Sequence, residues 1–68
     1  MSYETFISRV TEYLTASGES HESVMFSHDF EKGRHIALCP GGIKIFGNTI
    51  STRITVKWGS GHQATARV

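Results

Sequence analysis

The chain has 68 residues, of which 38% are hydrophobic and 19% are charged, and its formal net charge is +1. A chain of this length forms one domain with a small core, which leaves no room for a catalytic cavity behind a second layer of structure. Its one cysteine cannot close an internal disulfide, and no apolar segment approaches the roughly 20 residues that span a bilayer. We therefore expect a single domain over residues 1–68, no enzymatic activity, no membrane contact and a cytoplasmic location.

The small net charge conceals two oppositely charged parts. Residues 1–31 hold all six acidic side chains and one base, Arg9, for a sum of −5. Residues 32–68 hold no acid and six bases, for a sum of +6, and these bases are Lys32, Arg34, Lys44, Arg53, Lys57 and Arg67. A division of this kind is typical of proteins that contact an anionic partner such as nucleic acid.

Residues 3–17 are predicted to form an amphipathic helix. Ser2 is a suitable N-cap, and Glu4 places a negative charge in the first turn, near the positive end of the helix dipole. Apolar residues recur at spacings of three and four along one stripe, which contains Phe6, Ile7, Val10, Tyr13 and Leu14. Gly18 follows at a position where helices commonly end in a left-handed conformation. Such a stripe requires an apolar surface to cover.

From residue 23 onward the apolar residues alternate with a period of two, which is typical of β-strands. Five strands are predicted, over residues 23–30, 34–39, 43–46, 49–58 and 62–68. Glycine-containing turns separate them at residues 31–33, 40–41, 47–48 and 59–61. The predicted fold is therefore α+β, with one N-terminal helix packed on a five-strand antiparallel meander over residues 23–68. The meander forms either a twisted sheet or a partly closed small barrel.

Turn length predicts the strand register, because a one-residue slip sends every side chain of a strand to the opposite face. The predicted pairs are Phe26–Leu38, Leu38–Ile43, Ile45–Ile50 and Val56–Ala64. This parity places the apolar residues on one inner face against the helix, namely Val24, Phe26, Phe30, Ile36, Leu38, Ile43, Ile45, Ile50, Ile54, Val56, Trp58, Ala64 and Ala66.

The opposite parity predicts a basic outer face. In this register His35 lies opposite Phe46, so two rings stand beside basic side chains that can neutralise phosphates. Exposed rings stack on bases, at about 1–3 kcal/mol per base. The residues predicted to bind nucleic acid are Lys44, Arg53, Lys57, Arg67, His35 and Phe46. Alternating threonine and basic residues are also typical of an ordinary solvated sheet face, and the chain has none of the named nucleic-acid-binding motifs.

The same predicted face carries an apolar cluster that favours a second hypothesis. Its members are Met25, Ala37, Cys39 and Phe46, and exposed apolar clusters commonly mark protein contacts. On this hypothesis the chain is a protein-interaction or inhibitor module, or it forms a homodimer. Its acidic half could alternatively contact a basic protein surface that normally holds nucleic acid. The sequence leaves both hypotheses open.

Histidine spacing does not predict a metal site. His21, His28 and His35 are seven residues apart, but they are expected in a linker, on an inward strand position and on an outward one. Asp29 and His35 are expected to oppose each other as a surface pair. Cys39 lacks the neighbouring ligands of a zinc site. We expect no catalytic residue, no metal, no cofactor and no small-molecule substrate.

Overall fold

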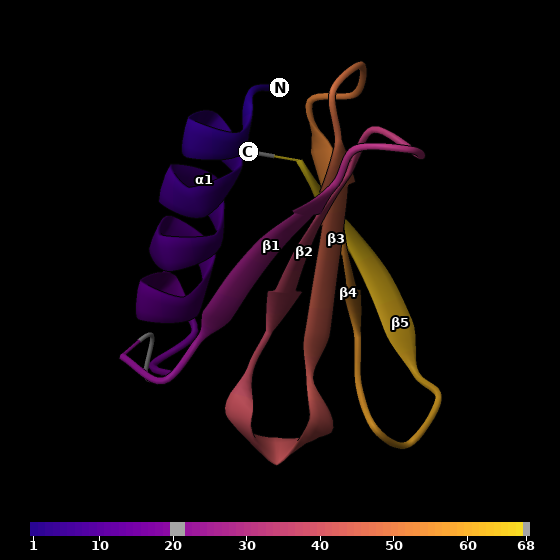
Figure 1. Cartoon of the computed structure of the whole chain (residues 1–68). Helices are drawn as coiled ribbons and strands as arrows, with labels where there is room; N and C mark the ends of the chain where they lie inside the picture. The colour runs from indigo at the N-terminus through magenta and orange to yellow at the C-terminus, as the bar shows by residue number, and fades with distance from the viewer. Residues whose placement is uncertain (20–21, 68) are drawn as a thin grey trace.

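A computed structural model describes residues 1–19 and 22–67, and in these residues one helix lies against one face of a five-stranded antiparallel sheet (Figure 1). For residues 66 and 67 only the backbone is described, and His21 and Val68 lie outside the described residues. The elements are α1 (Tyr3–Ala16), β1 (Met25–Asp29), β2 (Arg34–Leu38), a 3₁₀ turn (Pro40–Gly42), β3 (Lys44–Asn48), β4 (Arg53–Lys57) and β5 (Gln63–Arg67). The strand order is β1-β2-β3-β4-β5, so the sheet is open rather than closed into a barrel. The predicted α+β fold is confirmed.

Capping at both ends determines the length of α1. At its N-terminus the Ser2 hydroxyl oxygen accepts a hydrogen bond from the Thr5 amide at 3.1 Å. At its C-terminus Gly18 adopts a φ of 76°, and the Glu19 amide donates to the Leu14 carbonyl at 2.8 Å. The predicted stripe is buried at its centre, where Phe6, Val10 and Leu14 face the sheet.

The first hairpin has a register one residue away from the predicted one. Phe26 lies opposite Ala37 rather than Leu38, and Asp29 lies opposite Arg34 rather than His35. The turn therefore contains four residues, 30–33. The Asp29 carboxylate accepts hydrogen bonds from the backbone amides of Glu31 and Lys32, at 3.1 and 3.3 Å, so the chain turns one residue earlier.

The second hairpin is also displaced by one residue, which inverts β2 alone. Leu38 lies opposite Lys44 instead of Ile43, because the 3₁₀ turn lengthens the connection and the Cys39 amide donates to the Ile43 carbonyl at 2.8 Å. The two displacements cancel beyond β2, so β1 and β3 keep their predicted faces. The predicted sides of four β2 residues are wrong: Ile36 and Leu38 lie on the outer side, and His35 and Ala37 lie on the inner side. Cys39, which follows the strand, packs against the core instead of lying on the outer face as predicted.

The third connection is longer than predicted, and β4 begins four residues late. Ile45 pairs with Val56 rather than Ile50, so residues 49–52 form a loop. The parity is unchanged, and β4 keeps its predicted faces. Ile50 itself is 92% exposed, and Phe30 in the first turn is 88% exposed, so the prediction that both lie in the core is wrong. The fourth register, with Val56 opposite Ala64, is confirmed.

The core lies between α1 and the inner face of the sheet. Its buried apolar residues in the described part of the chain are Phe6, Val10, Leu14, Ala37, Ile45, Ile54 and Val56. Gly47 is buried beneath the helix, and a Cβ added there would lie 2.7 Å from Cδ1 of Phe6. Only glycine leaves room at that point for the Phe6 ring. No helix in the described residues is long and apolar enough to cross a membrane.

Candidate nucleic-acid interface

The outer face of the sheet is left uncovered, because α1 packs on the inner face and no other described segment crosses the outer one (Figure 1). The strand residues whose described side chains have the outer parity are Met25, Ser27, Asp29, Arg34, Ile36, Leu38, Lys44, Phe46, Asn48, Arg53, Thr55, Lys57, Gln63 and Thr65. Four of these are bases and one is acidic. The carboxylate of Asp29 is already engaged by the two amides of the first turn. The face therefore presents an excess of positive charge.

The structure places most of the predicted binding residues together on the outer face and one of them on the inner face. Lys44, Phe46, Arg53 and Lys57 occupy outer positions on β3 and β4 as predicted. His35 does not join them, because the inverted β2 buries it under α1 with 1% of its surface exposed. The side chain of Arg67 lies outside the described residues, although its backbone pairs with Arg53.

Arg34 and Lys32 are the members of the site that sequence parity missed. The inversion of β2 turns Arg34 to the outer side, and Lys32 reaches the same surface from the first turn. One sequence signal for this exists at Asp29, since an aspartate at the start of a turn commonly binds the amides two and three residues later. That interaction adds the residue that shifts the register.

Phe46 is flanked by two cations from neighbouring strands. The Arg34 guanidinium carbon, from β2, lies 5.3 Å from the centre of the Phe46 ring, and Nζ of Lys57, from β4, lies 5.4 Å from it. Cations at this distance are attracted by the π-electrons of the ring, at about 0.5–1 kcal/mol for exposed pairs. An aromatic surface and two positive charges are thus held together at the centre of the face.

Like charges are paired across the same strands. Lys44 lies directly opposite Lys57, and Arg53 lies opposite Arg67 in the β4–β5 register. Like charges directly opposite each other destabilise a sheet. The arrangement costs stability in the isolated protein, and an anionic partner would relieve it.

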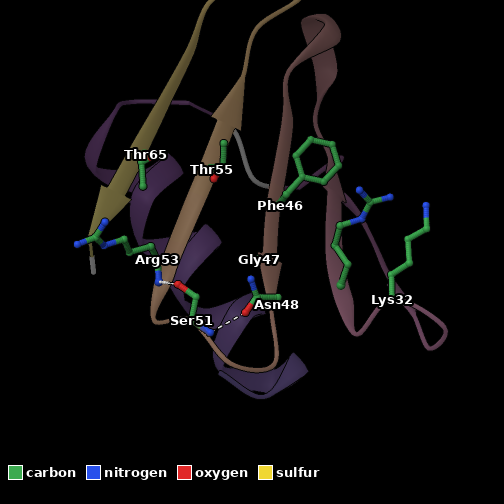
Figure 2. A pocket seen from close by; sticks show the side chains of 9 residues that line it. Lys32, Phe46, Gly47, Asn48, Ser51, Arg53, Thr55 and Thr65 are labelled. Atoms are coloured by element: carbon green, nitrogen blue, oxygen red, sulfur yellow. Dashed lines mark hydrogen bonds between the residues drawn. The ribbon is translucent and has the colours of Figure 1, made fainter.

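A concave pocket of about 410 Å³, which we term the outer pocket, opens beside Phe46 (Figure 2). It is lined by Lys32, Arg34, Phe46, Gly47, Asn48, Ser51, Arg53, Thr55 and Thr65. It forms where β3 and β4 diverge, since their pairing stops at Phe46 and Thr55. Lys32 and Arg53 lie on opposite sides of it in Figure 2.

The predicted protein-contact cluster is not assembled. Ala37 is fully buried and Cys39 is partly buried, both on the inner side, whereas Met25 and Phe46 lie on the outer side. Burial raises the pKa of the Cys39 thiol above its ordinary value, and the nearby Glu19 carboxylate adds to this shift. Met25 instead lies opposite Leu38, and the two are 70% and 42% exposed.

His28 and His35 lie in a separate region, under the N-terminal end of α1. Nδ1 of His28 lies 2.8 Å from Nδ1 of His35, and Nε2 of His35 lies 2.9 Å from the Met1 carbonyl oxygen. With Tyr3, Phe30 and Thr49 they line a mainly apolar groove of about 530 Å³. Within residues 1–19 and 22–67, no three histidine, cysteine or acidic side chains are close enough to hold a metal ion.

Comparison of the chain with protein-family models, curated proteins and solved structures gives no match. The outer face carries positive charge, hydroxyl groups and a central ring. Basic side chains of this kind contact phosphates, and a ring supplies a stacking surface that tolerates any base.

Proposed function

We propose that this protein is a non-enzymatic binding module whose outer sheet face binds single-stranded nucleic acid. The observation that carries the proposal is the placement of Phe46 between the cations of Arg34 and Lys57 on a sheet face that no described segment covers. Lys44 and Arg53 extend the positive charge along the same face.

The physical argument is that each component contributes a different part of the affinity. Lysine and arginine release counterions from the phosphate backbone, which provides affinity that does not depend on sequence and falls with salt. A base stacked on Phe46 would add about 1–3 kcal/mol. Bases are accessible for stacking in a single strand but not inside a duplex, so the central ring favours single-stranded nucleic acid.

Fluorescence anisotropy with labelled oligonucleotides tests this proposal. Single strands of mixed sequence should bind more tightly than the matching duplex, and their affinity should fall steeply between about 50 and about 200 mM salt. The Arg53→Glu, Lys57→Glu double variant should lose most of this affinity and show a smaller salt dependence.

The matched control is Arg9→Glu, which reverses a charge on α1, on the other side of the molecule. It should leave binding nearly unchanged, and Arg53→Glu alone, which changes the net charge equally, should not. Absence of binding near about 50 mM salt, or equal losses in Arg9→Glu and Arg53→Glu, would overturn the proposal.

A second candidate function is self-association through the β1 edge of the outer face. The observation that favours it is the exposed cross-strand pair of Met25 and Leu38. Met25 belongs to β1, an edge strand whose other side pairs with no described strand. Light scattering after size-exclusion chromatography would then detect a dimer that Met25→Asp dissociates and Arg53→Glu does not. A monomer at all accessible concentrations would exclude it.

A further inference from the structure

We infer that the outer pocket binds a phosphate group of the nucleic-acid strand, with the side-chain amide of Asn48 as a central hydrogen-bond donor. This inference rests on the proposed function, because it takes the phosphate to belong to a bound strand. It adds a specific site to that function: one phosphate occupies the pocket, and the attached nucleotide lies beside Phe46.

Divergence of β3 and β4 creates the space. Ladder pairing covers Lys44–Phe46 and stops there, so Gly47 and Asn48 on β3 do not pair with the start of β4. The loop at residues 49–52 is held by the side chains of Asn48 and Ser51 and by two contacts to backbone carbonyls. The Thr49 amide donates to the Gly33 carbonyl at 3.1 Å, and the Met1 ammonium donates to the Ser51 carbonyl at 3.0 Å. Ser51 Oγ accepts from the Arg53 amide at 3.0 Å, which leaves its hydroxyl hydrogen free to donate to a ligand.

The orientation of the Asn48 amide is determined by the same loop. Its Oδ1 accepts hydrogen bonds from the backbone amides of Ile50 at 2.9 Å and Ser51 at 2.6 Å. Both partners are donors, so Oδ1 rather than Nδ2 must face them. The Nδ2 group therefore points away from the loop, on the pocket side (Figure 2), and it can only donate.

Arg34 contributes a positive charge to the lining of the pocket. Its Nε is buried and has no hydrogen-bond partner among the described residues, although Arg34 lines the pocket. An unsatisfied buried donor is costly, at about 1–3 kcal/mol and more for a charged group. Because Nε itself is not accessible to solvent, Arg34 acts on a ligand in the pocket through the positive charge of its guanidinium group.

The lining as a whole selects an anion. Three cations line the pocket (Lys32, Arg34 and Arg53), three hydroxyl groups come from Ser51, Thr55 and Thr65, and no carboxylate is present among the lining residues. A phosphate presents oxygens in several directions and matches donors that converge from several strands. The volume of about 410 Å³ exceeds that of a phosphate alone and leaves room for a sugar next to Phe46.

Asn48→Asp is the decisive variant. A carboxylate at this position still accepts from the amides of Ile50 and Ser51, so the loop keeps its hydrogen bonds. It replaces the Nδ2 donor with a negative oxygen. The matched control is Lys44→Gln, which also lowers the net charge by one on the same face but does not line the pocket.

Oligonucleotide binding to the two variants distinguishes the pocket from the face. Asn48→Asp should weaken single-strand binding by about tenfold or more, as expected when a charge-assisted hydrogen bond is lost. Lys44→Gln should weaken it only a few-fold, through a salt slope lower by about one. Equal losses would overturn the inference and leave the proposed function intact. Thermal melts of both variants confirm that they fold.

A second measurement uses small probes and does not require a strand to bind. In ¹H–¹⁵N spectra, inorganic phosphate and a nucleoside monophosphate should shift the Asn48 side-chain NH₂ signals, and the nucleoside without phosphate should not. Unmoved NH₂ signals would overturn the phosphate site. Movement with inorganic phosphate, in a protein that binds no oligonucleotide, would overturn the nucleic-acid source and the proposed function together.

Discussion

The two faces of the sheet differ in whether their polar groups have hydrogen-bond partners within the protein. On the inner face the buried ring of His35 has a partner at each nitrogen, His28 at 2.8 Å and the Met1 carbonyl at 2.9 Å. On the outer face Nε of Arg34 is buried without a described partner, and the Asn48 Nδ2 is turned to an open pocket. The difference is that the polar groups buried on the inner face are paired within the protein, whereas these two groups of the outer face have no partner among the described residues.

The hydrogen bonds of the inner face also fix the orientation of the His35 ring. A carbonyl oxygen only accepts, so Nε2 of His35 carries the hydrogen that it donates to Met1. The Nδ1 atoms of His28 and His35 are within hydrogen-bond distance, so one ring donates to the other. Two imidazole rings and one backbone group thus tie the start of the chain to β1 and β2.

The largest contrast is expected between two phenylalanines on opposite faces. Phe6 is fully buried, so Phe6→Ala should lower the free energy of unfolding by about 3–5 kcal/mol. Phe46→Ala should cost clearly less stability, because solvent already reaches the Phe46 ring, but it should weaken oligonucleotide binding. Urea unfolding followed by circular dichroism, together with anisotropy, measures both quantities. A larger loss of stability in Phe46→Ala than in Phe6→Ala would contradict the assignment of stability to the inner face.

A smaller contrast concerns two histidines. His35→Leu should lower the free energy of unfolding by about 1–3 kcal/mol, because it leaves the Met1 carbonyl and the His28 ring without their partners. The control is His62→Leu, at an exposed position, which should change it by about 0.5 kcal/mol or less. Equal effects in the two variants would show that the inner histidine pair does not contribute to stability.

The smallest expected effect is the pH dependence from Cys39. Burial raises the pKa of this thiol in the folded state, and the Glu19 carboxylate raises it further. The stability associated with the shift is therefore present below the pKa of the unfolded chain and is lost as the pH rises through the folded value. Between about pH 8 and about pH 10, the free energy of unfolding should fall more for the native protein than for Cys39→Ala.

Alkylation of the thiol by iodoacetamide provides a direct check on the same shift. The reaction should be slower in the folded protein than in urea, and Glu19→Gln should accelerate it slightly at alkaline pH. A folded thiol that reacts as fast as the unfolded one would contradict a raised pKa.

The spacing of apolar residues along the sequence was sufficient to predict most of the fold. The stripe of α1 with its Ser2 cap, the existence of the strands, the faces of β1, β3 and β4, and the pairing of Val56 with Ala64 were all predicted from the spacing of apolar residues. Strand β4 carries its apolar side chains, Ile54 and Val56, on one parity only, whereas β1 and β3 each place one large apolar residue, Met25 or Phe46, on the outer parity. The outer positions of Lys44, Arg53 and Lys57 followed from the same parity.

The tertiary structure alone decided the orientation of β2 and the existence of the outer pocket. Strand β2 has nonpolar side chains on both parities, Ile36 and Leu38 on one and Ala37 on the other, so its pattern is compatible with either face. Hydrogen bonds of the Asp29 side chain and the 3₁₀ turn set the two connection lengths, and small Ala37 lies beneath the helix. That choice buries His35 and turns Arg34 outward.

The pocket depended on a further detail that spacing does not encode. The Asn48 side chain holds the loop in place of strand pairing, so β3 and β4 separate beside Phe46. The sequence by itself determined which residues favour burial and which favour solvent. Side-chain hydrogen bonds in the connections determined the register, and through it which charged groups meet around the pocket.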